Sequence, residues 1–416
     1  MKPEIRQRIE MIRRGEVPEG YKKKCGKVLP LTWDTSKMKE ICIINPLRPE
    51  VIPEKVVFLS MTDVSEDGKI LHQQKVDYQS VKQGFTPFQK GDVLVAKITP
   101  CFENGKGAHT ENLVTDVGFG STEFHVLRSK INSTYTFYHT VFENFRKKLE
   151  REMTGSAGQK RVQTASLANY SIAVPPAAEQ QKIAAILTTQ DKVIELKEKR
   201  LTEKLRQKKY LMQQLLTGRK RLPGFRGEWR EEYLGKLFRE RKETNCEGLE
   251  MLAITGTQGI IPRKELDLKD NSSEDKSKYL RVCIGDIGYN TMRMWQGVSA
   301  YSDYKGIVSP AYTILKPSLL VDAKYFAYLF KMPEMIFLFY RFSQGLVDDT
   351  RNLKYENFKK IKVVYPVDKS EQTAIAQVLS TADREISLLR QDIEQEKQKK
   401  KALMQLLLTG IVRVCP

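Results

Sequence analysis

The sequence predicts an α+β protein with two mixed sheet-and-helix domains, separated by two long antiparallel coiled-coil helices, in a pseudo-twofold internal repeat. Three observations lead to this prediction. The 416 residues correspond to two or three domains at roughly 150 residues each. Residues 179–218 align without gaps onto residues 371–410, with 18 identities in 40 positions. Upstream of each copy, strand-like alternation and Gly-rich turns dominate.

The first segment, residues 1–22, is expected to be helical at its start. Glu4 to Gly15, followed by VPEGYK, resembles the end of a repeat helix followed by RLPGFR at residues 221–226. This resemblance predicts that the N-terminus docks beside the C-terminal helix and closes the repeat into a ring. No run within Met1 to Glu10 resembles a signal-peptide core.

Two domains of unlike sequence are predicted over residues 23–176 and 221–366. They share only a Leu-Pro pair before a tryptophan and a Gly-Asp pair before an apolar residue. These landmarks are Leu29-Pro30, Trp33, Gly91-Asp92, Leu222-Pro223, Trp229 and Gly285-Asp286. Each domain ends in a strand-like approach to proline, SIAVPP at 171–176 and IKVVYP at 361–366, so we expect a twisted sheet with flanking helices.

Long helices are predicted over residues 177–220 and 367–416, because Gly closes each copy, no Pro interrupts it, and good helix formers dominate. Apolar residues recur every seven positions and form a seam: Leu187, Ile194, Leu201 and Leu215 in the first copy, and Leu379, Ile386, Ile393 and Leu407 in the second. Lys208 and Lys400 take the fourth seam position, where a polar residue weakens the pairing but can fix its register. A helix of about 38 residues, roughly 57 Å long, needs a partner along such a seam. The other copy is the obvious partner, and the alternative is that each helix packs only on its own domain.

The composition favours a polyanionic partner. Lys and Arg total 70 against 51 Asp and Glu, and the formal charge of +19 suits nucleic acid or an anionic membrane surface. With 40% hydrophobic residues the chain is globular rather than disordered. The longest apolar stretch, Met335 to Tyr340, is far shorter than the ~20 residues that cross a bilayer. Six dispersed cysteines without zinc-type spacing argue against a disulfide framework or structural zinc, so we expect a cytoplasmic protein.

These features together resemble the specificity subunit of type I restriction-modification systems, over the whole chain. The resemblance rests on the proline and Glu-Gln pairs at Pro176 to Gln180 and Pro366 to Gln372, on the helix ends LMQQLLTG and LMQLLLTG, and on RLPGFRGEW at Arg221 to Trp229. Three stretches look like common variants of target-recognition domains: GDVLVAKITPCFENGKGA at 91–108, YNTMRMWQGV at 289–298 and GIVSPAY at 306–312. The order and spacing of these motifs are more specific than any one of them.

The resemblance implies a non-catalytic subunit that recognises DNA. In that family two target-recognition domains each read half of a bipartite, asymmetric sequence in double-stranded DNA. The long helices hold the domains apart and bind two modification (methyltransferase) subunits, and restriction (translocase and endonuclease) subunits complete the complex. S-adenosylmethionine would then bind the modification subunits, and ATP and magnesium would serve the restriction subunits, so no cofactor or metal is expected in this chain. No membrane partner is implied.

The residues themselves show no catalytic motif. The sequence has no Gly-rich phosphate loop, no dinucleotide fingerprint and no Asn-Pro-Pro-Tyr or Asp-Pro-Pro-Tyr box of an amino-methyltransferase. Asp267-Leu268-Lys269 has the Asp-x-Lys form of a nuclease site, but the tripeptide is common in solvated loops. The four histidines lack ligand spacing and suit surface or core roles: His72, His109, His125 and His139.

Candidate DNA-binding residues in the first domain surround a turn. They are Lys97, Thr99, Asn104 and Lys106. Gly105 and Gly107 would let the backbone of this turn come close to a phosphate or a base edge.

In the second domain one polar segment carries side chains suited to reading bases. Asn290, Arg293 and Gln296 alternate with Met292, Met294 and Trp295. Arg pairs with guanine in bidentate fashion, and Asn or Gln with adenine. The alternative is a strand whose core face is the apolar set, with Arg293 merely exposed; both interpretations can hold together. A second Gly-punctuated loop of the same kind carries Thr257, Gln258, Arg263 and Lys264.

A third group lies just before the last strand of each domain. Lys160 and Arg161 follow Gly155 to Gln159, and Arg351 follows Gly345 and an Asp pair. Contact with phosphate and plain solubility are equally good interpretations. The lysines at 208–209 and 397–401 are better explained as a solvated helix face or a surface for partner subunits.

Two recognition domains on one face of a duplex would read half-sites about one helical turn, 10 to 10.5 base pairs, apart. The paired helices would set that distance, and unlike domains imply unlike half-sites. The competing functions are a self-sufficient restriction enzyme or methyltransferase, which needs a cofactor motif, and a structural coiled-coil adaptor. Steep loss of binding with salt separates DNA recognition from the adaptor.

Overall fold

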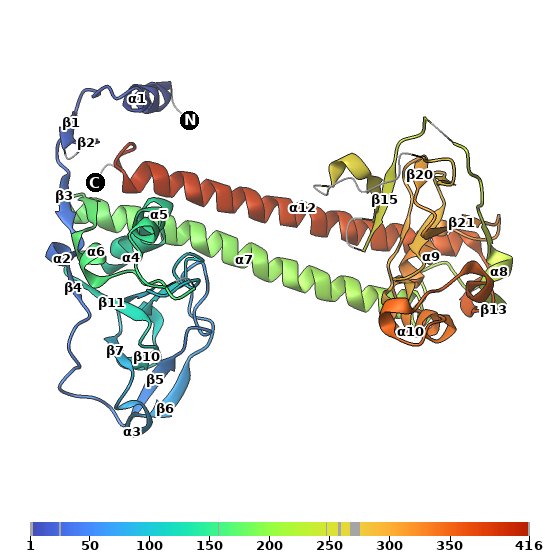
Figure 1. The fold of residues 1–416 in the computed structure, drawn as a ribbon, viewed down its shortest axis with the longest axis horizontal. Helices are drawn as coiled ribbons and strands as arrows, with labels where there is room; N and C mark the ends of the chain where they lie inside the picture. Colours follow the sequence, from blue (N-terminus) through green and yellow to red (C-terminus); the bar gives the residue numbers. More distant parts are fainter. Residues whose placement is uncertain are drawn as a thin grey trace. The chain divides into compact units, whose positions relative to one another are not determined.

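The computed structural model describes residues 3–24, 26–156, 158–246, 248–256, 259–266 and 275–414. The chain forms two compact units, Met1–Leu196 with Ile393–Pro416, and Lys197–Asp392 (Figure 1). Two long helices, α7 (Ala177–Leu215) and α12 (Lys369–Leu408), each contribute one part to either unit. Among the described residues, no helix is both long and apolar enough to cross a membrane. The α+β class is confirmed, whereas the predicted segment boundaries stay predictions.

The first unit combines short strands with short helices. Its helices are α1 (Pro3–Arg13), α2 (Met38–Ile41), α3 (Tyr78–Val81), a 3-10 turn η1 (Thr110–Asn112), α4 (Ser133–Val141), α5 (Glu143–Arg151) and α6 (Thr164–Asn169). Its strands are β1 (Tyr21–Lys24), β2 (Lys27–Pro30), β3 (Asp34–Lys37), β4 (Cys42–Ile44), β5 (Lys55–Leu59), β6 (Gln74–Asp77), β7 (Thr86–Gln89), β8 (Val93–Ala96), β9 (Gly107–His109), β10 (Val117–Gly120), β11 (Phe124–Ser129) and β12 (Ser171–Val174).

The second unit is built in the same way. Its helices are α8 (Leu234–Leu237), α9 (Ala323–Leu329), α10 (Pro333–Phe342) and α11 (Tyr355–Phe358), with 3-10 turns η2 (Arg263–Glu265), η3 (Met294–Gln296) and η4 (Asp348–Thr350). Its strands are β13 (Trp229–Tyr233), β14 (Phe238–Glu240), β15 (Leu252–Thr255), β16 (Gly259–Pro262), β17 (Leu280–Val282), β18 (Ile287–Asn290), β19 (Ser299–Tyr301), β20 (Gly306–Val308), β21 (Tyr312–Pro317) and β22 (Lys362–Pro366).

The main sheet has the same strand order in both units. The order is β4-β11-β8-β9 in the first and β14-β21-β18-β19 in the second, and all neighbours are antiparallel. The strand before each long helix also pairs alike, β12 with β3 and β22 with β13. A second sheet, β6-β5-β10-β7, has its counterpart in the hairpin β15-β16 and the pair β17-β20. The internal repeat therefore extends through the domains, although their sequences differ between the landmarks.

The shared Gly-Asp landmark has a structural explanation. Gly91 and Gly285 have φ angles of +88° and +93°, which favour glycine. The next residue, Asp92 or Asp286, is buried, and its carboxylate accepts the backbone N–H three residues earlier at 2.7 Å in both units. Each carboxylate also pairs with an arginine, so the buried charge is compensated.

Each unit has one large core in which its sheet, its helices and parts of both long helices meet. In the first unit Ile183 and Leu187 of α7 and Leu407 of α12 join the core around Trp33. In the second unit Leu215 of α7 with Ile375 and Leu379 of α12 occupy the corresponding places. The long helices thus pack on the domains as well as on each other.

The two long helices run antiparallel where they pair. In the first unit Gln190 Nε2 donates to Glu396 Oε2 at 2.6 Å, and in the second Lys197 pairs with Asp392 at 2.8 Å. Among the apolar seam residues, Leu201 is half-buried and the others are buried: Leu187, Ile194, Leu215, Leu379, Ile386, Ile393 and Leu407. The predicted antiparallel pairing of the two copies is confirmed.

The seam lysines have carboxylate partners on the opposite helix. Lys400 pairs with Asp191 at 2.6 Å in the first unit, and Lys208 pairs with Asp383 at 2.5 Å in the second. The same two aspartates accept hydrogen bonds from tyrosine hydroxyls of the domains, Tyr138 and Tyr328, both at 2.8 Å. Each seam lysine therefore belongs to a Tyr-Asp-Lys contact that joins both helices to the domain.

The Glu-Gln pair at the start of each long helix anchors it. Buried Glu179 is paired with Arg413, and buried Glu371 with Arg221, so each glutamate accepts hydrogen bonds from the arginine just beyond the end of the other helix. The neighbouring Gln180 and Gln372 accept the backbone N–H of Asn132 and Asp322, the N-caps of α4 and α9. This is why both residues recur in the repeat.

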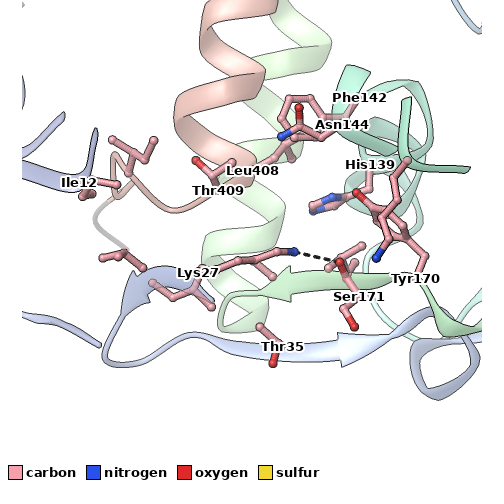
Figure 2. A pocket seen from close by; sticks show the side chains of 16 residues that line it. Ile12, Lys27, Thr35, His139, Phe142, Asn144, Tyr170, Ser171, Leu408 and Thr409 are labelled. Carbon is pink, nitrogen blue, oxygen red and sulfur yellow. Dashed lines mark hydrogen bonds between the residues drawn. The ribbon is translucent and has the colours of Figure 1, made fainter. Parts of the chain in front are cut away.

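The N-terminal segment meets the end of α12 through Tyr21, whose hydroxyl donates to the carbonyl of Ile411 at 3.1 Å. None of the residues of α1 is buried. A cavity of about 470 Å³ lies here, lined by Ile12, Leu408 and His139 among others (Figure 2). The N-terminal segment thus docks beside α12 through Tyr21, and α1 contributes Ile12 to the cavity and a hydrogen bond from Arg8 to Tyr21.

Gly410 and Gly218, which end the two repeat copies, pack on equivalent tryptophans. A Cβ at Gly410 would lie 3.1 Å from the Trp33 ring, and one at Gly218 would lie 3.3 Å from the Trp229 ring. In the second unit the chain runs directly from the glycine to the tryptophan. In the first, the two residues come from opposite ends of the sequence, which agrees with the predicted closure of the repeat.

Candidate nucleic-acid interface

Each domain has a loop, just before its last short helix, whose two ends are joined by a pair of backbone hydrogen bonds. Thr154 and Arg161 exchange two backbone hydrogen bonds at 3.1 and 2.8 Å, and Gln344 and Asn352 exchange two at 2.8 and 2.7 Å. The residues between each pair form a mostly exposed loop. We define these as loop 1, residues 155–160, of which Ala157 lies outside the described residues, and loop 2, residues 345–351.

Both loops begin with a glycine in nearly the same conformation. Gly155 has φ +133° and Gly345 has φ +132°, a region that L-residues avoid. A Cβ would lie 2.8 Å from the Gln159 carbonyl oxygen in loop 1 and 2.7 Å from that of Thr350 in loop 2. Only glycine lets each loop fold back this tightly.

Each loop is hydrogen-bonded to the residue that follows a strand of the main sheet, and the two strands are equivalent in the two units. Val162 N–H donates to the Lys97 carbonyl after β8, and Leu353 N–H donates to the Thr291 carbonyl after β18, at 2.9 and 2.8 Å. The predicted similarity of position between the Lys160-Arg161 and Arg351 segments is therefore real at the level of backbone geometry.

In the first domain the structure brings four predicted residues together: Lys97, Thr99, Lys160 and Arg161. Thr99 N–H donates to the Lys160 carbonyl at 2.9 Å, and Ile98 and Arg161 form an isolated bridge. Lys160 is exposed, whereas the Arg161 guanidinium is paired with Glu123 at 2.9 Å. Hydrogen bonding to Glu123 raises the pKa of Arg161, so the arginine stays charged. It would have to exchange or share this carboxylate to reach a phosphate.

Asn104 and Lys106 lie further along the same chain segment, and they differ in whether the side chain is held by other residues of the domain. Asn104 is exposed. Lys106 Nζ donates to the Met61 carbonyl at 2.8 Å, which holds it against its own domain.

The role predicted for the glycines around this turn is not what the structure shows. A Cβ at Gly105 would lie 2.5 Å from the Glu66 carbonyl oxygen, and one at Gly107, which lies in β9, would lie 2.6 Å from that of Leu94. Both glycines are needed because the chain's own backbone comes close. The expectation that they leave room for a phosphate or base edge is therefore replaced by a packing role.

In the second domain the polar segment is a turn and not a strand. Strand β18 ends at Asn290, whose side chain accepts the Met292 N–H at 3.0 Å, and Met294 begins the 3-10 turn η3. Met294 is buried and Met292 is exposed. The alternative of an alternating strand is thus wrong, because the Asn290 side chain turns the chain immediately after the strand.

This turn presents Arg293 and Gln296 to solvent. Neither side chain has a hydrogen bond or ion pair to another described residue. Asn290 itself is half-buried and serves the turn. Of the three predicted base readers, two are therefore available and one is occupied in shaping the backbone.

Arg351 of loop 2 is stacked rather than free. Its guanidinium carbon lies 4.0 Å from the centroid of the Tyr340 ring, and its Nε donates to Asp348 Oδ1 at 3.2 Å. The Tyr340 ring contacts Trp295 edge-on at a centroid distance of 6.2 Å. This arginine-aromatic stack joins loop 2 to the turn that carries Arg293.

The remaining predicted residues of the second domain do not join this cluster. Arg263 and Lys264 form η2 after β16, and Lys264 pairs with Glu250 at 2.7 Å. Thr257 and Gln258, and the nuclease-like Asp267 to Lys269, lie outside the described residues.

The histidines take structural positions, as predicted. Burial lowers the pKa of His139 to about 3, and burial also lowers the pKa of His125, whose Nε2 lies 2.9 Å from the Val162 carbonyl beside loop 1. His109 contacts Ser133 at 3.1 Å, and His72 is exposed. No group of three potential metal ligands occurs among the described residues.

Sequence reasoning missed Glu123, Tyr340 and the two domain tyrosines, Tyr138 and Tyr328. The tyrosines follow the N-caps of α4 and α9 in the pattern Asn/Asp-x-x-Tyr-x-x-Tyr, which repeats at 132–138 and 322–328. Its offset is two residues shorter than that of the helix repeat, so an ungapped alignment does not find it. Glu123 and Tyr340 have no counterpart in the other domain, and no sequence signal marks them.

Comparison with known proteins gives a consistent result. The sequence profile of the type I restriction modification DNA specificity domain matches residues 30–207 and 250–398. The chain is 35% identical over 188 residues to the EcoAI specificity subunit of Escherichia coli, a match that covers 42% of this chain and 32% of that protein. It is 23% identical to the putative MjaX specificity subunit of Methanocaldococcus jannaschii, over 95% of this chain and 97% of that one.

Two solved structures share the fold. A chain from a structure of type I restriction-modification complex assembly superposes with a TM-score of 0.57 and 17% identity, covering 92% of this chain and 99% of that chain. The S subunit from M. genitalium gives a TM-score of 0.56 at 12% identity, with coverages of 90% and 96%. Because the family profile matches more than half of its residues, the chain belongs to the family of type I restriction-modification DNA specificity domains.

Proposed function

We propose that this chain is the DNA sequence-recognition subunit of a type I restriction-modification complex. The observation that carries the proposal is the repetition of one loop scaffold with unlike side chains. Loop 1 carries Lys160 next to Arg161, and loop 2 carries Leu346 and Val347 with Arg351 stacked on Tyr340. Equal scaffolds with unlike contact residues suit two unlike half-sites in one double-stranded target.

The chain would act without catalysis of its own. Its two domains would read a bipartite, asymmetric sequence, and the paired helices would scaffold two modification subunits and the restriction subunits. S-adenosylmethionine would bind the modification subunits, and ATP and magnesium the restriction subunits. Support for a partner surface comes from exposed apolar side chains on the long helices, Leu205 and Leu388, on faces that their own unit leaves uncovered.

Recognition would combine phosphate contacts with base contacts. Exposed Lys160 suits the phosphate backbone, and exposed Arg293 and Gln296 suit base edges. The excess of positive charge would speed the encounter with DNA and make binding sensitive to salt.

Long-read mapping of methylated bases tests the function directly. The genome is compared with this gene intact and deleted, in a strain that expresses the partner methyltransferase. We expect one gapped, asymmetric, adenine-methylated motif to disappear on deletion. If the intact strain shows no such motif, the recognition function is wrong. A structural adaptor would be supported in that case if the affinity of the chain for DNA changed little with salt concentration.

A further inference from the structure

The second unit contains a cavity of about 880 Å³ between its domain and the long helices, and its lining is rich in cations. Four basic side chains line it, against two carboxylates. The basic residues are Lys208, Lys324, Lys331 and Arg390, and the acidic ones are Asp303 and Asp383. Asp383 is already paired with Lys208 and Tyr328, and Asp303 lies 3.5 Å from Lys324.

Two cations of this cavity therefore remain without a carboxylate. Among the described residues, neither Lys331 nor Arg390 has an ion pair. The Lys331 ammonium donates to the Gly297 carbonyl at 2.7 Å, and burial lowers its pKa to about 8. Ser299, another lining residue, is fully buried, and its hydroxyl has no hydrogen-bond partner among the described residues. A buried hydroxyl without a hydrogen-bond partner is costly, whereas Lys331 is half-buried and Arg390 is exposed.

The first unit shows what occupies the corresponding place there. Residues 60–73, which connect β5 to β6, carry Glu66 and Asp67 onto the side of α4 and line a cavity with Lys400 of α12. A Cβ on the next residue, Gly68, would lie 2.6 Å from Phe137 and 3.2 Å from Val141, so this acidic loop packs directly on α4. Desolvation raises the pKa of Asp67, but hydrogen bonds from Ser65 and Lys69 and the charges of Lys69 and Lys400 outweigh it and lower the pKa.

The second unit lacks this loop and changes the surface beneath it. Only residues 256–258 connect β15 to β16, the counterparts of β5 and β6. With the offset set by Tyr138 and Tyr328, Phe137 corresponds to Ala327 and Val141 to Lys331. Both replacements line the cavity. A smaller residue and an added cation stand where the first unit packs its own acidic loop.

We infer that this cavity receives an acidic segment of a modification subunit, whose carboxylates take the place that Glu66 and Asp67 hold in the first unit. The inference rests on the proposed function, because it assumes that the long helices bind modification subunits. A carboxylate entering the cavity would pair with half-buried Lys331 and exposed Arg390. The two units of the chain would then bind their two modification subunits unequally.

The experiment measures the affinity of the purified full-length chain for its modification subunit, over a range of salt concentrations. The test variant combines Lys331→Glu with Arg390→Glu. The matched control is Arg384→Glu, which reverses an exposed charge on α12, the helix that also carries Arg390. Arg384 does not line the cavity. Because Lys331→Glu buries a new charge, Lys331→Met serves as a second variant that removes the cation but keeps an apolar stem.

We expect the double reversal to weaken binding of the modification subunit by about tenfold or more and to flatten its salt dependence. Lys331→Met should weaken it less, and Arg384→Glu should leave it unchanged. DNA affinity is measured with Arg390→Glu alone, because Lys331 donates to the Gly297 carbonyl at the end of the turn that carries Arg293 and Gln296. The affinity of this variant for its DNA target should stay at the wild-type level. A Lys substitution of the contacting carboxylate in the modification subunit should restore part of the binding that the double reversal loses.

Unchanged assembly of both Lys331 variants would overturn the inference. Weakened DNA affinity of Arg390→Glu with normal assembly would assign the cavity to a phosphate instead of an acidic segment. If the wild-type chain binds neither the modification subunit nor DNA, the proposed function itself fails, which is a different result.

Discussion

At the scale of single residues, the structure separates arginines that are free to read DNA from those already engaged. Arg161 is paired with Glu123, and Arg351 is stacked on Tyr340. Arg293 stands on a tight turn held by Asn290 and is exposed. A rigid backbone with a free guanidinium is the arrangement that bidentate base contacts require.

Replacing Arg293 with alanine should therefore relax recognition at one base position in one half-site. We expect a loss of about 1 to 3 kcal/mol against the preferred base and little loss against its alternatives, if the contact is bidentate. The measurement is the affinity for a set of duplexes that vary one position at a time.

Arg239→Ala, which removes an exposed arginine from β14 of the same domain, is the matched control and should leave the preference intact. A uniform loss across all duplexes would show instead that Arg293 contacts a phosphate.

Residue types indicated what the chemistry could be, but not which side chains are free. Lys97, Thr99, Lys160 and Arg161 were predicted from two separate stretches, and the structure joins them beside one strand end. The Glu123 partner of Arg161 lies 38 residues away, and no pattern links them. Gly105 and Gly107 were predicted to leave room for DNA, but in the structure they leave room for the chain's own backbone. A sequence shows that glycine is needed at such a position without showing which group comes close.

At the scale of secondary-structure elements, the seam of the long helices shows how polar residues can be built into an apolar interface. A lysine in a heptad seam is unfavourable when its ammonium is buried without a partner. Here Lys208 reaches Asp383, which also accepts the Tyr328 hydroxyl, and Lys400 reaches Asp191 in the same way. The contact can form in only one alignment of the two helices, which supports a role in fixing the register.

Asp383→Asn should consequently destabilise the second unit by about 1 kcal/mol, because it removes the charge that both Lys208 and Tyr328 depend on. Glu385→Gln is the matched control, since the Lys204–Glu385 pair at 2.6 Å is more exposed and has no tyrosine. Urea unfolding, followed through the hydrogen exchange of α12 amides, would measure the loss of stability in each of the two variants.

Equal effects of the two substitutions would contradict the special role of the Tyr-Asp-Lys contact.

The heptad pattern predicted the antiparallel pairing, and the repeat marked Asp191 and Asp383 as shared positions. The sequence could not predict their ion pairs with the seam lysines, because each pair joins residues far apart in the chain: Lys208 and Asp383 are 175 positions apart.

At the scale of the whole molecule, duplication explains more of the structure than sequence identity suggests. The main sheets share strand order, the loops share glycine geometry, and the helix ends share the contact of glycine with tryptophan. The alignable repeat covered only the helices, since surface loops diverge while the strand pairing they connect is kept. What the sequence could not predict is where the units differ, as in the acidic loop of the first and the cationic cavity of the second.

If the paired helices set the spacing of the two half-sites, their length should determine the gap in the DNA target. Insertion of four helix-forming residues after Leu196 and four after Asp392 would lengthen both helices where the two units divide. Each insertion adds about 6 Å, close to the rise of two base pairs. Contacts within each unit, such as Lys208–Asp383 and Lys400–Asp191, would be retained because both partners stay on the same side of the insertions.

Methylation mapping of a strain carrying this variant should show both half-sites unchanged and a longer gap between them. Insertion into α7 alone is the control, because it lengthens one helix against an unaltered partner and should lower stability without producing a new motif. A methylated motif with the original gap in the doubly lengthened variant would refute the role of the helices as a spacer. It would mean that the recognition domains take their separation from the partner subunits or from the DNA itself.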